Sequence, residues 1–268
     1  MTTRDAVRDA ERVVIKLGTR VLTREDGSLA LSRLFGLIEQ MAAMQRSGRQ
    51  VILVSSGAVG LGVEALGVSP AASDLSLRQA CAAVGQSRLM ELYQQGFGRL
   101  GAKVAQILLT RSDFDHPSPR ESLGRVLNEL LERGAIPIVN ENDVVSTEEL
   151  EFRGPYGFGD NDQLSALLAR QLGCDLLVLC TNVSGVYDRD PRSDASARLL
   201  EQVDDPSALE FGAPGKSGRG GMRSKVEAAR LASEGGCDVL VIDGRTPELL
   251  ARAVAGDAVG TWFPKASA

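Results

Sequence analysis

Short runs of Val, Ile and Leu recur along the 268-residue chain, with amphipathic segments between most of them. Such runs are typical of strands that are buried on both faces, and helices are the usual connections between parallel strands. The alternation therefore predicts an α/β fold, a three-layer α/β/α sandwich around a largely parallel central sheet. The expected strands are Val13 to Leu17, Val51 to Ser55, Val104 to Leu109, Ile136 to Asn140, Leu176 to Cys180, Val239 to Asp243 and Val259 to Phe263.

The clearest helix is predicted over Leu31 to Arg46, where apolar residues follow the i, i+3, i+4, i+7 pattern. Two polar segments, Thr147 to Gly159 and Asp188 to Gly221, interrupt the alternation. Long polar loops in a compact domain are more often functional than not. Because strong helix and strand patterns continue on both sides of each loop, we expect a single domain over residues 1–268.

The charge balance narrows the choice of partners. The chain has 30 basic and 35 acidic side chains, a formal charge of −5, which disfavours nucleic acids and anionic membranes. Its four cysteines form no Cys-x-x-Cys pair, and a single histidine leaves no zinc site by spacing. With a polar N-terminus and apolar runs far below the roughly 18 residues that span a bilayer, we expect a cytoplasmic location and reduced cysteines.

Lysines and glycines gather directly after expected strands and at the start of an expected helix. Lys16 to Thr19 ends the first strand, Ser55 to Gly62 follows the second, and Gly218 to Lys225 opens a helix. Backbone N–H groups and ammonium groups at such positions bind phosphates, and ligands of parallel sheets lie beyond the carboxyl ends of the strands. The alternatives are a solvated lysine and a tight strand-to-helix turn.

Carboxylates and amides gather at two further positions of this kind. Asn140 to Asp143 follows another strand, and Gly159 to Asp162 precedes the helix expected from Leu164 to Leu172. These groups suit an ammonium or a hydrated cation, and the alternative is an Asx turn or a helix N-cap. Together with the lysines they suit phosphoryl transfer, in which positioning and charge neutralisation provide most of the catalysis.

The motifs of three other enzyme classes match the sequence less well. Gly60-x-Gly62-x-x-Ala65 loosely matches a dinucleotide fingerprint, so a dinucleotide-dependent oxidoreductase is an alternative, but no acidic strand end follows about 20 residues later. Gly215-Lys216-Ser217 is no P-loop, because Glu210 stands where that motif needs glycine. A single histidine and the lack of a Gly-x-Ser-x-Gly elbow count against acyl-transfer hydrolysis.

In their order and spacing, six segments resemble the motifs of the amino acid kinase family. The resemblance runs from Val13 to about Phe263. It implies the amino acid kinase fold and transfer of the γ-phosphoryl group of ATP to the side-chain carboxylate of L-glutamate, the first step of proline biosynthesis. It also implies Mg²⁺ bound mainly by phosphate oxygens and water, with no protein ligand. The segments are Lys16 to Thr19, Ser55 to Ala58, Ala83 to Leu89, Asn140 to Asp143, Gly159 to Asp162 and Gly220 to Lys225.

The resemblance also implies roles for single residues. Lys16 and Lys225 would neutralise charge on the transferring phosphoryl group, and Asp162 would hold both lysines. Substrate binding would fall to Ser56, Gly57, Asp143 and Asn161, with Asp143 facing the α-ammonium group. Nucleotide binding would fall to Lys16, Thr181, Asn182, Arg219, Gly220, Gly221, Met222, Arg223, Ser224 and Lys225. Asn182 stands where the family usually has Asp.

Assembly and regulation follow from the resemblance alone. It implies a homo-oligomer, a dimer or tetramer, feedback inhibition by proline, and a chain without the C-terminal PUA domain of many bacterial members. Two alternatives keep the fold. One is a kinase acting on another small carboxylate, a carbamate or a phosphate, and the other is a non-catalytic sensor of glutamate or proline. Asn182 and the segment Pro119 to Ser122, which departs from the family pattern, motivate the sensor.

Overall fold

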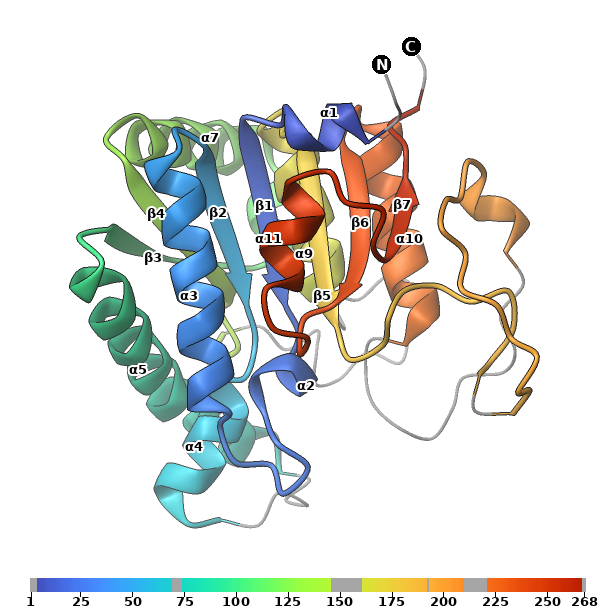
Figure 1. The fold of residues 1–268 in the computed structure, drawn as a ribbon. Helices are drawn as coiled ribbons and strands as arrows, with labels where there is room; N and C mark the ends of the chain where they lie inside the picture. Colours follow the sequence, from blue (N-terminus) through green and yellow to red (C-terminus); the bar gives the residue numbers. More distant parts are fainter. Residues whose placement is uncertain (1–3, 69–73, 146–160, 192, 210–220, 267–268) are drawn as a thin grey trace.

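The computed structural model describes residues 4–68, 74–145, 161–191, 193–209 and 221–266. Within these ranges seven strands form one sheet, in the order β3-β4-β2-β1-β5-β6-β7 (Figure 1). The expected strands are confirmed, and most differ by one residue at an end. Their bounds are β1 Arg12–Leu17, β2 Gln50–Ser55, β3 Lys103–Leu109, β4 Ala135–Glu141, β5 Leu176–Thr181, β6 Asp238–Asp243 and β7 Thr261–Phe263.

The last strand begins at Thr261 rather than at Val259. Gly260, directly before it, has a φ of +66°, in the left-handed region that an extended strand cannot use. A Cβ atom at Gly260 would also lie 2.3 Å from the carbonyl oxygen of Val241. The turn into β7 therefore needs glycine, and it delays the start of the strand.

Strand β1 is central, and every pairing from β3 to β6 is parallel, while β7 runs antiparallel to β6. The chain builds the β2 side of the sheet first and then returns to place β5 on the other side of β1. The carboxyl ends of the parallel strands thus share one edge, which we call the carboxyl edge. Ligands of open parallel sheets bind at this edge where the strand order reverses, which here is next to β1.

Helices cover both faces of the sheet, which confirms the three-layer sandwich. Helices α3, α5 and α11 lie on one face, and α7, α9 and α10 lie on the other (Figure 1). The helix expected at Leu31–Arg46 is α3. The other helices are α1 Asp5–Arg8, α2 Thr19–Leu22, α4 Ala58–Leu66, α5 Leu75–Arg99, α6 Ser112–Asp115, α7 Pro117–Glu132, α9 Asn161–Gln171, α10 Met222–Glu234, α11 Leu249–Val254 and the 3-10 turn η1 Pro206–Ala208.

Two apolar clusters fill the spaces between the sheet and its helices, and β1 contributes to both. Val13 and Ile15 pack into the cluster under α3 and α11, while Val14 packs into the cluster with α9 and α10. Successive side chains of a strand alternate between its faces. Lys16 therefore falls on the same face as Val14, toward α9 and α10.

Two further findings concern the cysteines and the apolar helices. All four cysteines are buried, and none is in a disulfide. In the described part of the chain, no helix is both long and apolar enough to cross a membrane.

Candidate active site

Two lysines and one aspartate meet at the carboxyl edge of the sheet. Lys16 Nζ lies 2.6 Å from Asp162 Oδ1, and Lys225 Nζ donates a hydrogen bond of 2.9 Å to Asp162 Oδ2. The three side chains come from β1, α9 and α10, and Asp162 is 0% exposed. Two ammonium groups share one carboxylate, so this lysine–aspartate trio carries one formal net positive charge.

The fold accounts for this convergence. Asp162 stands in the first turn of α9, where the helix dipole favours an acidic side chain. Lys225 stands in the first turn of α10, where the same dipole disfavours a cation. The carboxylate of Asp162 offsets that cost, because an opposite charge within hydrogen-bond distance stabilises a buried ammonium group. The trio is therefore predisposed to bind a further anion.

A network of side-chain amides lies next to the trio. Asn161 Nδ2 is placed to donate to Ser55 O at 2.8 Å, to Ser56 Oγ at 2.9 Å and to Asn140 Oδ1 at 2.9 Å. Asn140 Nδ2 in turn donates to Gln86 Oε1 at 2.8 Å. The network thus joins the ends of β2 and β4 to α5 and α9, and it brings Ser56 and Asn161 together as expected for one binding site.

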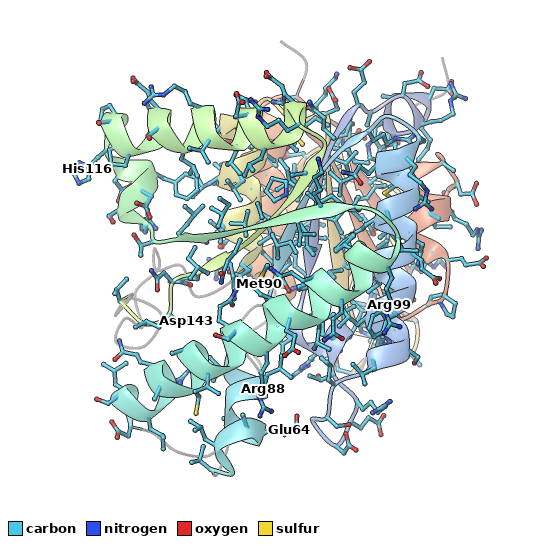
Figure 2. The ribbon with its side chains drawn as sticks, turned by 90° about the vertical axis from the view of Figure 1, so that its left-hand side faces the viewer. Glu64, Arg88, Met90, Arg99, His116 and Asp143 are labelled. Carbon is cyan, nitrogen blue, oxygen red and sulfur yellow. The ribbon has the colours of Figure 1, made fainter. Side chains whose placement is uncertain are left out.

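Gly57 and Asp143 follow the two strands, β2 and β4, whose ends contribute to this network. Gly57 has a φ of +103° and stands directly before α4, so the turn after β2 requires a glycine. Asp143 follows β4 and is half-buried. Figure 2 shows Asp143 beyond the end of β4, well separated from His116.

Helices α4 and α5 pack with their backbones in contact. A Cβ atom at Gly62 would lie 1.8 Å from the carbonyl oxygen of Cys81, and one at Gly85 would lie 1.7 Å from that of Ala58. Both glycines are therefore required by helix packing. This contact accounts for Gly62, the glycine on which the dinucleotide alternative depends.

The expected nucleotide residues are only partly within the described ranges. Thr181 ends β5 at the carboxyl edge, Asn182 follows it, and Gly221 precedes α10, whose first turn holds Met222, Arg223, Ser224 and Lys225. The structure does not bring Arg223 to the trio, because its guanidinium group pairs with Glu227 at 2.9 Å and its side chain is 72% exposed. Arg219 and Gly220 lie outside the described residues, as do Gly159 and Asp160.

Two buried groups near the site stay neutral. Burial raises the pKa of the Cys180 thiol to about 12, although the nearby Lys16 opposes the shift. Burial also raises the pKa of Tyr93, whose Oη shares a hydrogen bond of 2.7 Å with Ser55 Oγ. Neither group is a nucleophile or base at neutral pH. In the described ranges, no cluster of three or more His, Cys, Asp or Glu side chains could hold a metal ion.

Sequence reasoning assigned no role to Gln86 or Tyr93. They stand seven residues apart on α5, which places them two turns apart on one face of the helix. Two signals were available: the family-like segment Ala83 to Leu89, which contains Gln86, and the polar side chains on a buried helix face. Neither assigns a role to a single residue. The strands that this helix face contacts are fixed only by the tertiary structure.

Comparison with known proteins decides the family. The model of the family described as "Amino acid kinase family" matches residues 11–243. The chain belongs to the amino acid kinase family. Similar members include "Glutamate 5-kinase" of Gloeobacter violaceus, 45% identical over 94% of this chain and 68% of the relative. "Glutamate 5-kinase" of Symbiobacterium thermophilum is 42% identical over 98% of this chain and 99% of the relative.

Solved structures of two other kinases share the fold. UMP kinase from Ureaplasma parvum superposes with a TM-score of 0.64 at 18% identity, covering 96% of this chain and 99% of that one. Isopentenyl phosphate kinase from T. acidophilum gives a TM-score of 0.65 at 17% identity, covering 94% and 99%. At these identities the likeness concerns the fold, and it confirms the expected amino acid kinase architecture.

Proposed function

We propose that this chain is an ATP-dependent kinase that phosphorylates the side-chain carboxylate of L-glutamate to L-glutamyl 5-phosphate. The observation that carries the proposal is the buried trio of Lys16, Asp162 and Lys225, with a polar amide network beside it. The trio suits a phosphoryl group, and the network suits an amino acid. The names of the glutamate 5-kinase relatives, which match 94% and 98% of this chain, support this choice of acceptor.

The two lysines would stabilise the phosphoryl group during its transfer. Negative charge spreads over the phosphoryl oxygens as it transfers, and preorganised cations in a water-poor site stabilise that charge most strongly. Asp162 holds each ammonium group at 2.6 to 2.9 Å, so neither lysine has to reorganise during the reaction. Asp162 is thus a positioning residue for both.

The amide network would bind the acceptor. Asn161 Nδ2 lies 2.9 Å from Ser56 Oγ. Ser56 follows β2, and Asn161 is the first residue of α9. Asp143 would pair with the α-ammonium group of glutamate, and Gly57 would offer its backbone N–H. The γ-carboxylate of free glutamate is ionised at neutral pH, so no general base is needed to activate it.

The nucleotide would enter on the β5 and α10 side of the trio. Thr181 and Asn182 border that side, as do Gly221, Met222, Ser224 and Lys225. We include Arg219 and Gly220 in the proposed nucleotide site, whereas Arg223 pairs with Glu227 instead. When bound, Mg²⁺ neutralises charge between the β- and γ-phosphates, mainly through phosphate oxygens and water. The family resemblance extends the proposal to a single domain over residues 1–268, a cytoplasmic location in proline biosynthesis, a dimer or tetramer, and inhibition by proline.

A coupled assay tests the function directly. Purified protein with ATP, Mg²⁺ and L-glutamate should release ADP only when glutamate is present, and hydroxylamine should trap the acyl phosphate as a hydroxamate. ADP release with another small carboxylate, carbamate or phosphate, and not with glutamate, would assign a different acceptor. Tight binding of glutamate or proline without any turnover would instead identify a sensor.

A further inference from the structure

Gln86 has a buried donor that the network leaves unused. Its side chain is on α5, and the residue is 8% exposed. Gln86 Oε1 accepts the hydrogen bond from Asn140, but in the described part of the chain the buried Nε2 has no hydrogen-bond partner. A buried donor without a partner is unfavourable, because it has given up its hydrogen bonds to water and gained none in return. A ligand oxygen at this position would remove that cost.

The same network also has an unused acceptor. Asn161 Oδ1 is buried and has no hydrogen-bond partner among the residues that the structure describes. The other end of that amide, Nδ2, faces three acceptors. The network therefore presents one amide nitrogen with unused N–H groups and one amide oxygen without a donor. A zwitterionic amino acid offers the complementary pair, because its carboxylate accepts hydrogen bonds and its ammonium group donates them.

Asn140 connects the two unfilled groups. Its Oδ1 accepts from Asn161 Nδ2 and from the backbone N–H of Glu141, both at 2.9 Å, while its Nδ2 donates to Gln86. The amide of Gln86 is planar, and its Nε2 is bonded to the same carbon as its Oε1. The unfilled N–H is therefore held beside Asn140, at the carboxyl end of β4.

The position of α5 itself is fixed on both sides of Gln86. Gly85, the preceding residue, packs without a side chain against the carbonyl oxygen of Ala58 on α4. Seven residues further on, Tyr93 shares its hydrogen bond with Ser55 at the end of β2. A helix anchored in this way holds the Gln86 side chain in a defined place, as a binding residue requires.

We propose that Gln86 binds the amino-acid acceptor, with Nε2 donating to a carboxylate oxygen. Its Oε1 at the same time fixes Asn140, and through it the amide of Asn161. The inference rests on the proposed function, since it takes the acceptor to be an amino acid that binds beside the trio. It adds a contact from α5 to a site otherwise formed by residues at strand ends and helix starts.

Three variants test the proposal in steady-state assays with glutamate and with ATP varied in turn. Gln86→Glu keeps an oxygen for Asn140 but replaces the donor with negative charge. Gln86→Met keeps the length of the side chain and removes both polar groups. Gln95→Met is the matched control, because Gln95 is an exposed glutamine of the same helix that pairs with Glu91.

We expect the KM for glutamate to rise about 10- to 100-fold in both Gln86 variants, the range for a lost hydrogen bond to a charged group. The KM for ATP should stay within twofold, and Gln95→Met should behave as the wild type. An unchanged KM for glutamate in folded Gln86 variants would overturn the proposal, and so would a parallel rise of both KM values. Failure of both Gln86 variants to fold, while Gln95→Met folds, would assign Gln86 to structure alone.

The two proposals fail in different ways. Wild-type protein without glutamate-dependent ADP release would refute the proposed function, whereas active wild type with unaffected Gln86 variants would refute only the role of Gln86. For an inactive wild type, calorimetric titration with L-glutamate decides the second question. Binding by the wild type that both Gln86 variants lose would support the role, and no loss or no binding would overturn it.

Discussion

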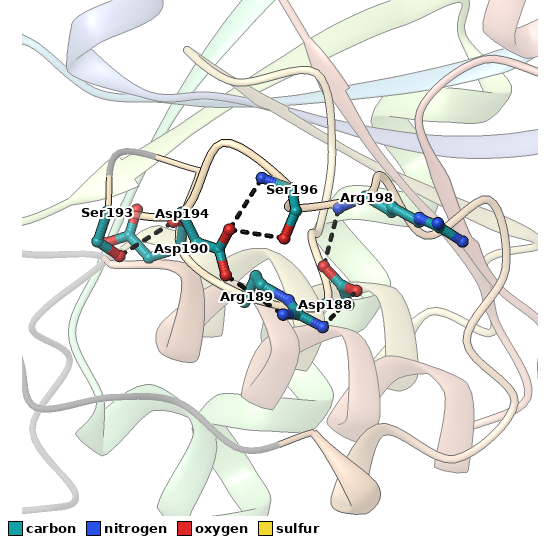
Figure 3. Close-up of polar contacts among 7 residues, drawn as sticks. All are labelled: Asp188, Arg189, Asp190, Ser193, Asp194, Ser196 and Arg198. Atoms are coloured by element: carbon teal, nitrogen blue, oxygen red, sulfur yellow. Dashed lines mark hydrogen bonds and ion pairs between the residues drawn. The ribbon is translucent and has the colours of Figure 1, made fainter.

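The buried trio at the carboxyl edge and the exposed loop at residues 188–191 and 193–198 are both dense in charge, but they are assembled in opposite ways. In the loop, Arg189 pairs with Asp188 at 3.5 Å and with Asp194 at 3.2 Å (Figure 3). Asp194 Oδ1 accepts from Ser196 N at 2.8 Å, and Asp188 Oδ1 accepts from Arg198 N at 2.8 Å. Each partner is a near neighbour in the chain, whereas the trio draws on three distant segments.

The difference shows which polar clusters indicate function. The loop side chains are largely exposed, so water solvates any group that lacks a partner, and their contacts are with residues no more than ten positions away. In the trio each charge is buried and would be costly alone, so the fold has to bring its partners from afar. Convergence of distant segments, rather than polar density along the sequence, marks the candidate site.

The largest effect is expected from Asp162→Asn, which removes the anion from between the two lysines. Two buried ammonium groups without their carboxylate should lower the free energy of unfolding by about 3–5 kcal/mol. Turnover should fall by about 10²- to 10³-fold or more, because both lysines lose their positioning. Urea titration and the coupled ADP assay measure the two quantities.

The loop supplies the control for this prediction. Asp194→Asn removes a carboxylate that likewise accepts hydrogen bonds and pairs with a cation, yet in an exposed setting. We expect its turnover within about twofold of the wild type and no clear change in the midpoint of unfolding. Equal losses in Asp162→Asn and Asp194→Asn would remove the distinction between the two regions.

The next effect is expected from Lys16→Ala and Lys225→Ala. Each should lower kcat by about 10²- to 10³-fold while the KM values for ATP and glutamate change by a few-fold at most, because the lysines act where charge develops. Single-turnover kinetics separate the chemical step from binding. Equal losses in kcat and in substrate affinity would contradict a role in the transition state.

Two glycines of α5 should differ in how an alanine substitution changes the free energy of unfolding, because only one of them contacts another helix. Gly85→Ala would place a Cβ atom 1.7 Å from the carbonyl oxygen of Ala58, whereas a Cβ atom at Gly98 meets nothing within 4 Å. We expect Gly85→Ala to lower the free energy of unfolding by about 1–3 kcal/mol or more. Gly98→Ala should be neutral or raise it by up to about 1 kcal/mol, since alanine favours a helix. Denaturant titrations of both variants measure this difference, and equal stabilities would contradict a backbone contact between α4 and α5.

The smallest effect is expected from Asp243, which ends β6 at the carboxyl edge but pairs locally with Arg245 at 2.8 Å. Burial alone raises the pKa of Asp243, but hydrogen bonds from the side chain and backbone of Arg245 outweigh it and hold the pKa below 3.8. The contribution of Asp243 to stability is therefore present above the unfolded pKa and is lost as pH falls through the folded pKa.

Asp243→Asn measures that contribution. The variant should be less stable than the wild type by no more than about 1 kcal/mol near neutral pH, and the difference should shrink as pH falls below about 4. Urea titrations at several pH values measure it. A difference that grows on acidification would show that the sign of the pKa shift is wrong.

The sequence predicted the sheet well because its strands are local features. Runs such as Leu176 to Cys180 need only their own residues to indicate a buried strand. The trio was also predictable, since parallel strands bring their carboxyl ends to one edge and the family resemblance named its members. Gln86 and Tyr93 were not assigned roles, because their meaning depends on which strands α5 crosses.

Strand β1 has a parallel partner along both of its edges, and Lys16 is a residue of this central strand. Central strands are among the last elements of a domain to open, so Lys16 cannot leave its place without loss of the whole sheet. Heat or urea should accordingly abolish turnover and the far-ultraviolet signature of the fold over the same interval. Turnover would then report the fraction of molecules that are still folded.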